Sequence, residues 1–196
     1  MSRGYTVAEV MISLALLGVG AGGVIATQKV TQIGNNNARN IATANAIAQT
    51  WAERLRAEAL SWNAPNGVDD LTTETNWLKH ADPTAPAWFN PDEVPLNGTA
   101  PAGSPVADIL GRDRFTGDTT PAAFCTKIRL QRLLIFPDNT IQNPTTTKII
   151  RAEIRVYWDR AGAPVNCSPI PEPGAPGTTH LGFVTLTTAI SQNSLP

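Results

Sequence analysis

The chain has 196 residues and a formal net charge of −1, and only 16% of its residues are charged. A nearly neutral chain has no long-range attraction for nucleic acid or anionic lipid. With roughly 60 residues in one extended helix, about 130 remain, which is enough for one compact domain and no more.

The first long segment is apolar. From Val10 to Gln28 the chain carries no charge, and a helix of that length spans about 28 Å, close to the thickness of a bilayer's hydrocarbon core. The single acid Glu9 stands at the start of this run, a few residues after a four-residue polar leader that ends at Gly4. A lone carboxylate at the end of a membrane-spanning helix is costly unless a positive group neutralises it.

The order Gly4, Tyr5, Thr6, Val7, Ala8, Glu9, followed by an apolar helix, resembles the class III signal of type IV pilins and pseudopilins. The resemblance implies cleavage between Gly4 and Tyr5 by a prepilin peptidase, N-methylation of Tyr5, and Glu9 as the fifth residue of the mature chain. Tyrosine replaces the usual phenylalanine, and Thr-Val-Ala-Glu replaces the commoner Thr-Leu-Ile-Glu. The glycine-rich, proline-free helix that follows resembles PilV-type minor pilins more than major pilins.

Glu9 has a physical role independent of the family. If the leader is removed, each subunit has a positive amine at Tyr5 and a negative carboxylate one helical turn later. In a stack of parallel helices the carboxylate of one subunit can then meet the amine of the next. Two alternatives remain open. Glu9 is an interfacial acid on an ordinary anchor, or the segment is a secretory signal peptide cleaved near residues 21–23.

Four glycines interrupt the apolar helix, and each costs up to about 1 kcal/mol relative to alanine. They predict a segment that can bend or locally melt, as the resemblance also implies for filament assembly. Gly18 and Gly22 form a G-x-x-x-G motif that permits close approach of another helix. Small residues on a lipid-facing helix explain the spacing equally well. The four are Gly18, Gly20, Gly22 and Gly23.

Residues 29–62 predict an amphipathic continuation of this helix, locally weakened by the asparagines at 35–37 and closed after Trp62 by Pro65 and Gly67. Its length from residue 6 to residue 62 would be about 85 Å. We expect its apolar stripe to pack on the chain's own sheet, with a coiled-coil partner as the alternative. The stripe consists of Ile41, Ala44, Ala48, Trp51, Leu55 and Trp62.

Residues 63–122 show poor periodicity, which predicts an ordered but irregular region. We expect the aromatic side chains of Trp77, Trp88 and Phe89 to hold this region in place. A short helix or strand is expected at 107–110 and at 113–115. The resemblance places partner-specific contacts in this variable region.

Residues 123–196 predict the sheet. Residues 148–159 alternate between apolar and polar side chains with a period of two, which is typical of a half-buried strand. Less regular strands are expected at 124–136 and 180–191. The predicted fold is therefore α+β, with a long N-terminal helix, membrane-spanning in residues 5–28, packed on a small antiparallel meander.

Cys125 and Cys167 are the only cysteines. We expect a disulfide, which would close a loop of about 43 residues and contribute roughly 3 to 4 kcal/mol to stability. Two buried free thiols, or a metal pair that lacks its other ligands, are the alternatives.

The sequence contains no recognisable catalytic motif, and we expect no catalytic residue, cofactor or metal. The acidic pairs Asp69/Asp70 and Asp92/Glu93 are interpreted as solvated turn residues. One alternative function is a DNA-uptake pilin with a basic strand face, although the net charge argues against nucleic-acid binding. That face would comprise Lys127, Arg129, Arg132, Arg151 and Arg155.

The resemblance implies a minor pilin of a type IV pilus, a structural subunit of a priming or tip complex. Its partners would be other minor pilins, the major pilin, a tip adhesin, the prepilin peptidase and the bacterial inner membrane. The subunit would cross that membrane once, with a cytoplasmic N-terminus, before it enters the pilus. A minor pseudopilin of type II secretion is the near alternative, and a membrane-tethered enzyme or receptor is the distant one.

Overall fold

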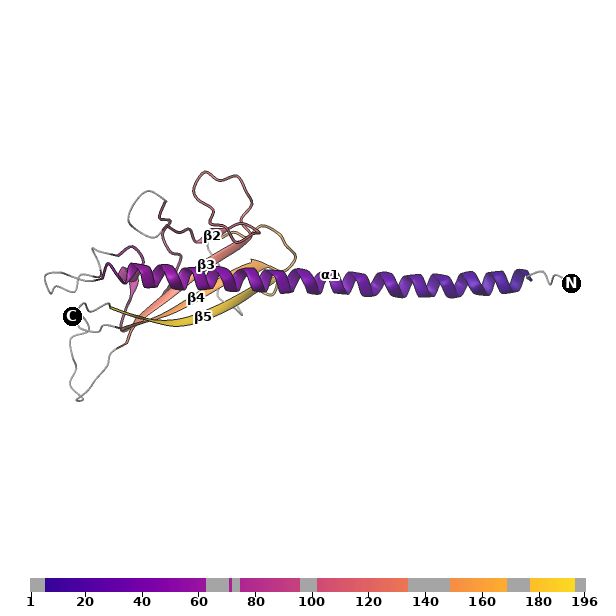
Figure 1. Ribbon diagram of the computed structural model, residues 1–196, viewed down its shortest axis with the longest axis horizontal. Coiled ribbons are helices and arrows are strands. Elements are labelled where there is room, and N and C mark those ends of the chain that lie inside the picture. The colour runs from indigo at the N-terminus through magenta and orange to yellow at the C-terminus, as the bar shows by residue number, and fades with distance from the viewer. Residues whose placement is uncertain are drawn as a thin grey trace. The chain divides into compact units, whose positions relative to one another are not determined.

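The computed structural model describes residues 6–62, 71, 75–95, 102–133, 149–168 and 177–192. The chain divides into two compact units, Met1–Asn40 and Ile41–Pro196. The secondary-structure elements, labelled in Figure 1, are α1 (Val7–Glu58), the 3-10 helix η1 (Leu78–His80), β1 (Trp88–Phe89), β2 (Val106–Ala107), β3 (Phe124–Arg132), β4 (Ile149–Asp159) and β5 (Leu181–Ser191).

The first unit consists, in its described part, of Thr6 and of α1 as far as Asn40. The helix is unbroken at residues 35–37, where the asparagines predicted a local weakening. Each asparagine costs only a fraction of a kcal/mol relative to alanine in a helix interior, so three of them do not by themselves break a helix. α1 is long and apolar enough to span a membrane by length and composition.

The second unit begins with the C-terminal part of α1, which lies on one face of the sheet (Figure 1). Of the residues predicted to form the apolar stripe, Ala44, Ala48, Trp51 and Leu55 are buried in the helix. The prediction is wrong at Ile41, which is 38% exposed. Ile41 lies ahead of the first buried turn, so the sheet does not cover it. The buried helical side chains are Ala44, Ile47, Ala48, Trp51, Ala52, Leu55 and Glu58.

The helix was expected to reach Trp62, but it ends at Glu58. Beyond that residue the backbone tightens: the N–H of Ser61 donates to the carbonyl of Glu58 at 2.9 Å, and the N–H of Trp62 donates to the carbonyl of Ala59 at 3.2 Å. Such i→i+3 bonds form turns tighter than an α-helix. They direct Trp62 into the core, where it is 1% exposed.

The sheet contains the predicted antiparallel meander. β3 pairs with β4 and β4 pairs with β5, both antiparallel, with Ile154 opposite Ile128 on one side and Leu186 on the other. The expected apolar face of β4 is buried from Ile150 to Trp158. The opposite face is less polar than predicted, because Tyr157 is buried against Cys125.

The region expected to be irregular adds two short strands to this sheet. β1 and β2 both pair with β3, so the sheet has five strands rather than three. Trp77 is fully buried and meets Trp51 edge to face, with ring centroids 5.0 Å apart. Of the elements expected near 107–115, the structure has only β2 and a bridge between Ala107 and Asp113. Strands this short leave no periodicity in the sequence.

Candidate functional site

The candidate site is the first turn of α1. Thr6 precedes the helix, and Glu9 is the acid of its first turn. One carboxylate oxygen of Glu9 accepts the backbone N–H of Thr6 at 2.9 Å and the Thr6 hydroxyl at 3.0 Å. In return, the N–H of Glu9 lies 3.4 Å from the Thr6 hydroxyl oxygen. This reciprocal pairing is a capping box, which satisfies N–H groups that a helix start otherwise leaves without partners.

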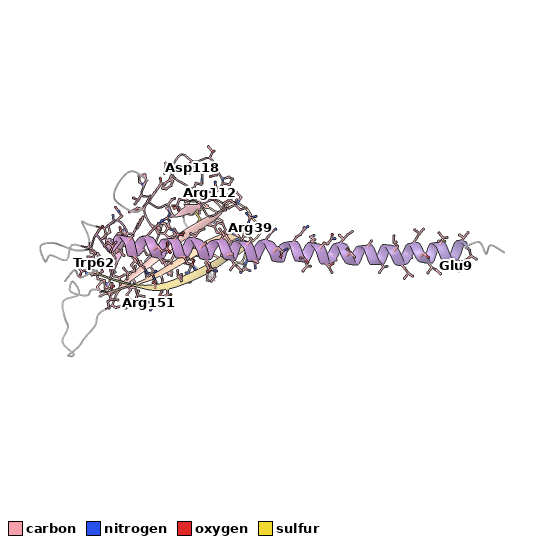
Figure 2. All side chains as sticks on the ribbon, in the orientation of Figure 1. Glu9, Arg39, Trp62, Arg112, Asp118 and Arg151 are labelled. Carbon is pink, nitrogen blue, oxygen red and sulfur yellow. A yellow bond between two sulfur atoms is a disulfide. The ribbon has the colours of Figure 1, made fainter. Side chains whose placement is uncertain are left out.

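Glu9 therefore has a partner inside its own chain, which the sequence analysis missed. The signal was present, because Thr-x-x-Glu before an apolar run is the sequence signature of a capping box. Figure 2 shows Glu9 at the start of α1. Gly4 and Tyr5, the predicted cleavage and methylation site, lie outside the described residues.

The helix behind Glu9 presents apolar side chains on every side. Every residue from Thr6 to Arg39 is exposed within the chain. A surface of this size and polarity marks contact with a membrane or with other polypeptides. Its exposed large side chains are Val7, Val10, Met11, Ile12, Leu14, Leu16, Leu17, Val19, Val24, Ile25, Val30 and Ile33.

The four predicted flexibility glycines, Gly18, Gly20, Gly22 and Gly23, all lie in regular helix. A Cβ added at any of them would meet nothing within 4 Å. No contact inside the described chain therefore requires glycine at these positions. Their bending and helix-packing roles remain predictions about an assembled state.

The structure joins Cys125 and Cys167 in a disulfide, with the two Cα atoms 5.4 Å apart. The bridge holds the segment after β4 against the start of β3. Two further contacts hold this segment: the N–H of Val165 donates to the carbonyl of Ala122, just before β3, at 2.9 Å, and the side-chain amide of Asn90, just after β1, donates to the carbonyl of Cys167 at 3.1 Å.

The predicted basic residues do not all share one face. Lys127, Arg129, Arg151 and Arg155 alternate with the core positions and lie on the side of the sheet away from α1, whereas Arg132 is in register with the core residue Ile150.

Two features of that face compete with an outside anion. Glu153, only 7% exposed, pairs with both Arg129 and Arg151. The guanidinium groups of Arg129 and Arg155 lie over the ring of Trp88, at 4.9 and 4.0 Å from its centroid. These internal partners reduce the positive potential that nucleic acid would meet.

The acidic neighbours Asp92 and Glu93 have separate partners. Asp92 lies 3.8 Å from Lys79, and Glu93 accepts the N–H and hydroxyl of Thr116. Asp69 and Asp70 lie outside the described residues. No cluster of three or more potential metal ligands occurs among residues 6–62, 71, 75–95, 102–133, 149–168 and 177–192.

Comparison of the chain with protein-family models, with curated proteins and with solved structures found no match. The capping box, the exposed apolar helix and the small antiparallel sheet therefore stand as the observations from which a function is argued.

Proposed function

We propose that this chain is a minor pilin of a type IV pilus, a structural subunit of the priming or tip complex from which the filament grows. The observation that carries the proposal is Glu9 in the first turn of α1, whose apolar N-terminal part is exposed at every residue as far as Arg39. The α+β layout of a long helix and a small antiparallel sheet is compatible with it. The sequence of residues 4–9, which resembles the class III signal of type IV pilins, supports it.

Thr6 and Glu9 supply the assembly chemistry. In the free subunit, the N–H and hydroxyl of Thr6 satisfy one carboxylate oxygen of Glu9 but bring no positive charge. Cleavage after Gly4 would create an amine at Tyr5, and a neighbouring subunit's amine could then approach the remaining carboxylate lone pairs. A charge near lipid costs up to roughly 2.5 to 3.5 kcal/mol on insertion scales. Pairing in the filament offsets that cost, so it favours assembly.

Mass spectrometry of the protein from its native membranes tests the processing step. We expect a chain that lacks residues 1–4 and begins with a methylated Tyr5. An intact Met1 would overturn the proposal, because the charge pair needs the new amine.

Replacement of the acid tests the assembly step. We expect Glu9→Ala to reduce incorporation into sheared filaments strongly while leaving membrane insertion unchanged, since the substitution removes a costly charge and the capping bonds to Thr6 but none of the apolar surface of the helix. Glu53→Ala is the matched control, because Glu53 is an exposed acid of the same helix. Normal incorporation of Glu9→Ala would contradict the proposal.

Deletion of the protein separates the pilus from a type II secretion pseudopilus. For a minor pilin we expect fewer surface pili and normal export of enzymes. Unchanged piliation with lost secretion would assign the chain to the pseudopilus. The glycine-rich apolar helix, which resembles PilV-type minor pilins, favours the pilus.

A further inference from the structure

The middle of α1 contains a segment whose composition is poor for a helix. Residues 34–40 have the sequence Gly-Asn-Asn-Asn-Ala-Arg-Asn, so five of the seven are glycine or asparagine. Asparagine side chains bond to nearby backbone groups in non-helical conformations, and glycine gains the most backbone freedom when a helix opens. All seven residues are helical in the structure. Their composition therefore opposes the conformation that they adopt.

No packing inside the described chain compensates for this composition. Every residue from 31 to 39 is exposed, including Arg39, which Figure 2 labels. No side chain from 34 to 40 forms a hydrogen bond or an ion pair with any residue that the structure describes. A Cβ at Gly34 would meet nothing within 4 Å. Because helices in proteins gain most of their stability from packing, this segment depends on its own backbone hydrogen bonds.

The helix on either side of the segment has support. On the C-terminal side, Ala44, Ile47 and Ala48 are buried against the sheet. On the N-terminal side lie large apolar side chains that a membrane would cover, in a helix that is long and apolar enough to span one. Opening a helix in lipid leaves backbone polar groups unsatisfied, which is costly. The nearest of these apolar side chains are Val24, Ile25, Val30 and Ile33.

Two factors set how often the segment opens. An interruption requires a second helix start, which lowers the open population by a nucleation factor of about 0.001 to 0.004. Against this, each of the four asparagines favours the open chain over alanine by about 3-fold and the glycine by about 5-fold, or about 400-fold together. Alanine itself favours the helix by a factor of about 1 to 1.6 per residue, so the product leaves on the order of a few per cent of the molecules open.

We propose that residues 34–40 form a hinge, at which the backbone hydrogen bonds of α1 open and re-form while the helix on either side stays intact. A hinge needs only a few residues that absorb a large change in backbone dihedral angles. Once open, the segment behaves as a flexible linker and transmits no fixed orientation. The sheet can then turn toward a partner without tilting the apolar part of α1 in the membrane. This use of the hinge rests on the proposed function, whereas the opening itself does not.

Amide hydrogen exchange of the full-length, 15N-labelled chain in detergent micelles tests the opening. We expect the amides of residues 38–40 to exchange at least about 100-fold faster than those of residues 48–55, which lie in the packed part of the helix. Equally slow exchange in the two ranges would overturn the proposal, because it would show that the segment opens only with the second unit.

Two alanine variants, one stiffened at the hinge and one control, separate the composition of residues 34–40 from general helix stabilisation. The stiffened variant should slow exchange at 38–40 by about tenfold or more, because it removes most of the preference for the open chain. The control changes four exposed polar residues of the packed part, and we expect exchange at 38–40 to stay the same. Exchange that is slowed no more in the stiffened variant than in the control would contradict the hinge. The stiffened variant carries Gly34→Ala, Asn35→Ala, Asn36→Ala and Asn37→Ala, and the control carries Asn45→Ala, Gln49→Ala, Thr50→Ala and Glu53→Ala.

Limited trypsin digestion in the same micelles gives an independent measure, because proteolysis follows the population of the opened chain. Arg39 lies in the hinge, whereas Arg54 and Arg56 lie in the packed part of α1. Of these three sites, we expect the cut after Arg39 to come first, and we expect the stiffened variant to slow it by about tenfold. A cut after Arg54 or Arg56 that is as early as the cut after Arg39 would overturn the proposal. Neither measurement involves removal of residues 1–4 or formation of filaments, so failure of the hinge is distinguishable from failure of the proposed function.

Discussion

The carboxylate of Glu58 accepts the backbone N–H of Trp77 at 2.9 Å, although the two residues are 19 positions apart. The N–H of Asn76 donates to the same oxygen as Trp77, and the other oxygen accepts the N–H of Leu78 at 3.0 Å. Glu58 ends α1 and is 2% exposed. One acid therefore fastens the chain before η1 to the end of the long helix.

Removal of this carboxylate should destabilise the second unit. Glu58→Ala leaves the backbone donors of residues 76–78 buried without acceptors, and we expect a loss of about 2 to 4 kcal/mol in the free energy of unfolding. Urea unfolding of the full chain in micelles, followed by tryptophan fluorescence, measures it. Glu53→Ala, at an exposed position of the same helix, should change stability by less than about 0.5 kcal/mol. Equal effects of the two substitutions would refute the anchoring role.

Glu58 also predicts a pH dependence. Burial raises its pKa above the ordinary value of 4.5, while the N–H donors of Trp77, Leu78 and Asn76 and the charge of Lys79 act in the opposite direction. The folded state then holds the proton more tightly than the unfolded state, so the contribution of this group is largest below pH 4.5. It is lost as the pH rises through the folded pKa.

Urea unfolding at several pH values measures this effect. Relative to Glu58→Gln, which does not titrate, the wild-type chain should lose stability as the pH rises from the ordinary pKa of 4.5 through the raised pKa of the folded state, by at most about 1.4 kcal/mol per pH unit. A difference between the two proteins that grows in favour of the wild type as the pH rises would mean that the donors outweigh burial.

Gly182 offers a third prediction, because it lies opposite Trp158 in the β4–β5 ladder. A Cβ at Gly182 would come within 2.4 Å of the indole ring of Trp158, which is 3% exposed. Gly182→Ala must therefore displace a buried ring, and we expect a loss of about 1 to 3 kcal/mol. Thermal unfolding followed by near-ultraviolet circular dichroism measures it. Thr185→Ala, on the exposed face of the same strand, is the control, and an equal effect there would rule out the steric explanation.

The sequence predicted the parts of this fold that have strong periodicity. The alternation in β4 identified its buried face, and the recurrence of Ala44, Ala48, Trp51 and Leu55 identified the buried side of α1. Both patterns arise because one side of a regular element faces the core. β1 and β2, with two residues each, are too short to show such a pattern.

The charged residues show the limit of periodicity. From the sequence, Glu58 belongs to the polar face of the helix. It is buried because residues 76–78 lie against the end of α1 and donate backbone N–H groups to its carboxylate. Glu153 likewise reads as a solvated residue, but Arg129 and Arg151 on either side enclose it. For the candidate site the reverse holds, since the capping box between Thr6 and Glu9 is local and readable from four consecutive residues. Local hydrogen bonds can be inferred from sequence, whereas partners supplied by distant segments cannot.

The disulfide gives the last prediction. Because Cys125 and Cys167 lie 42 positions apart, the bridge restricts the unfolded chain, and its removal in the double variant Cys125→Ala, Cys167→Ala should cost about 3 to 4 kcal/mol. The contacts of Val165 and Asn90 persist in that variant, so we expect the native fold with a lower urea midpoint. Reduction of the wild-type chain with dithiothreitol should lower the midpoint similarly and leave the double variant unaffected. An unchanged midpoint in both cases would show that the packing of Tyr157 and Leu181 holds this end of the sheet without the bridge.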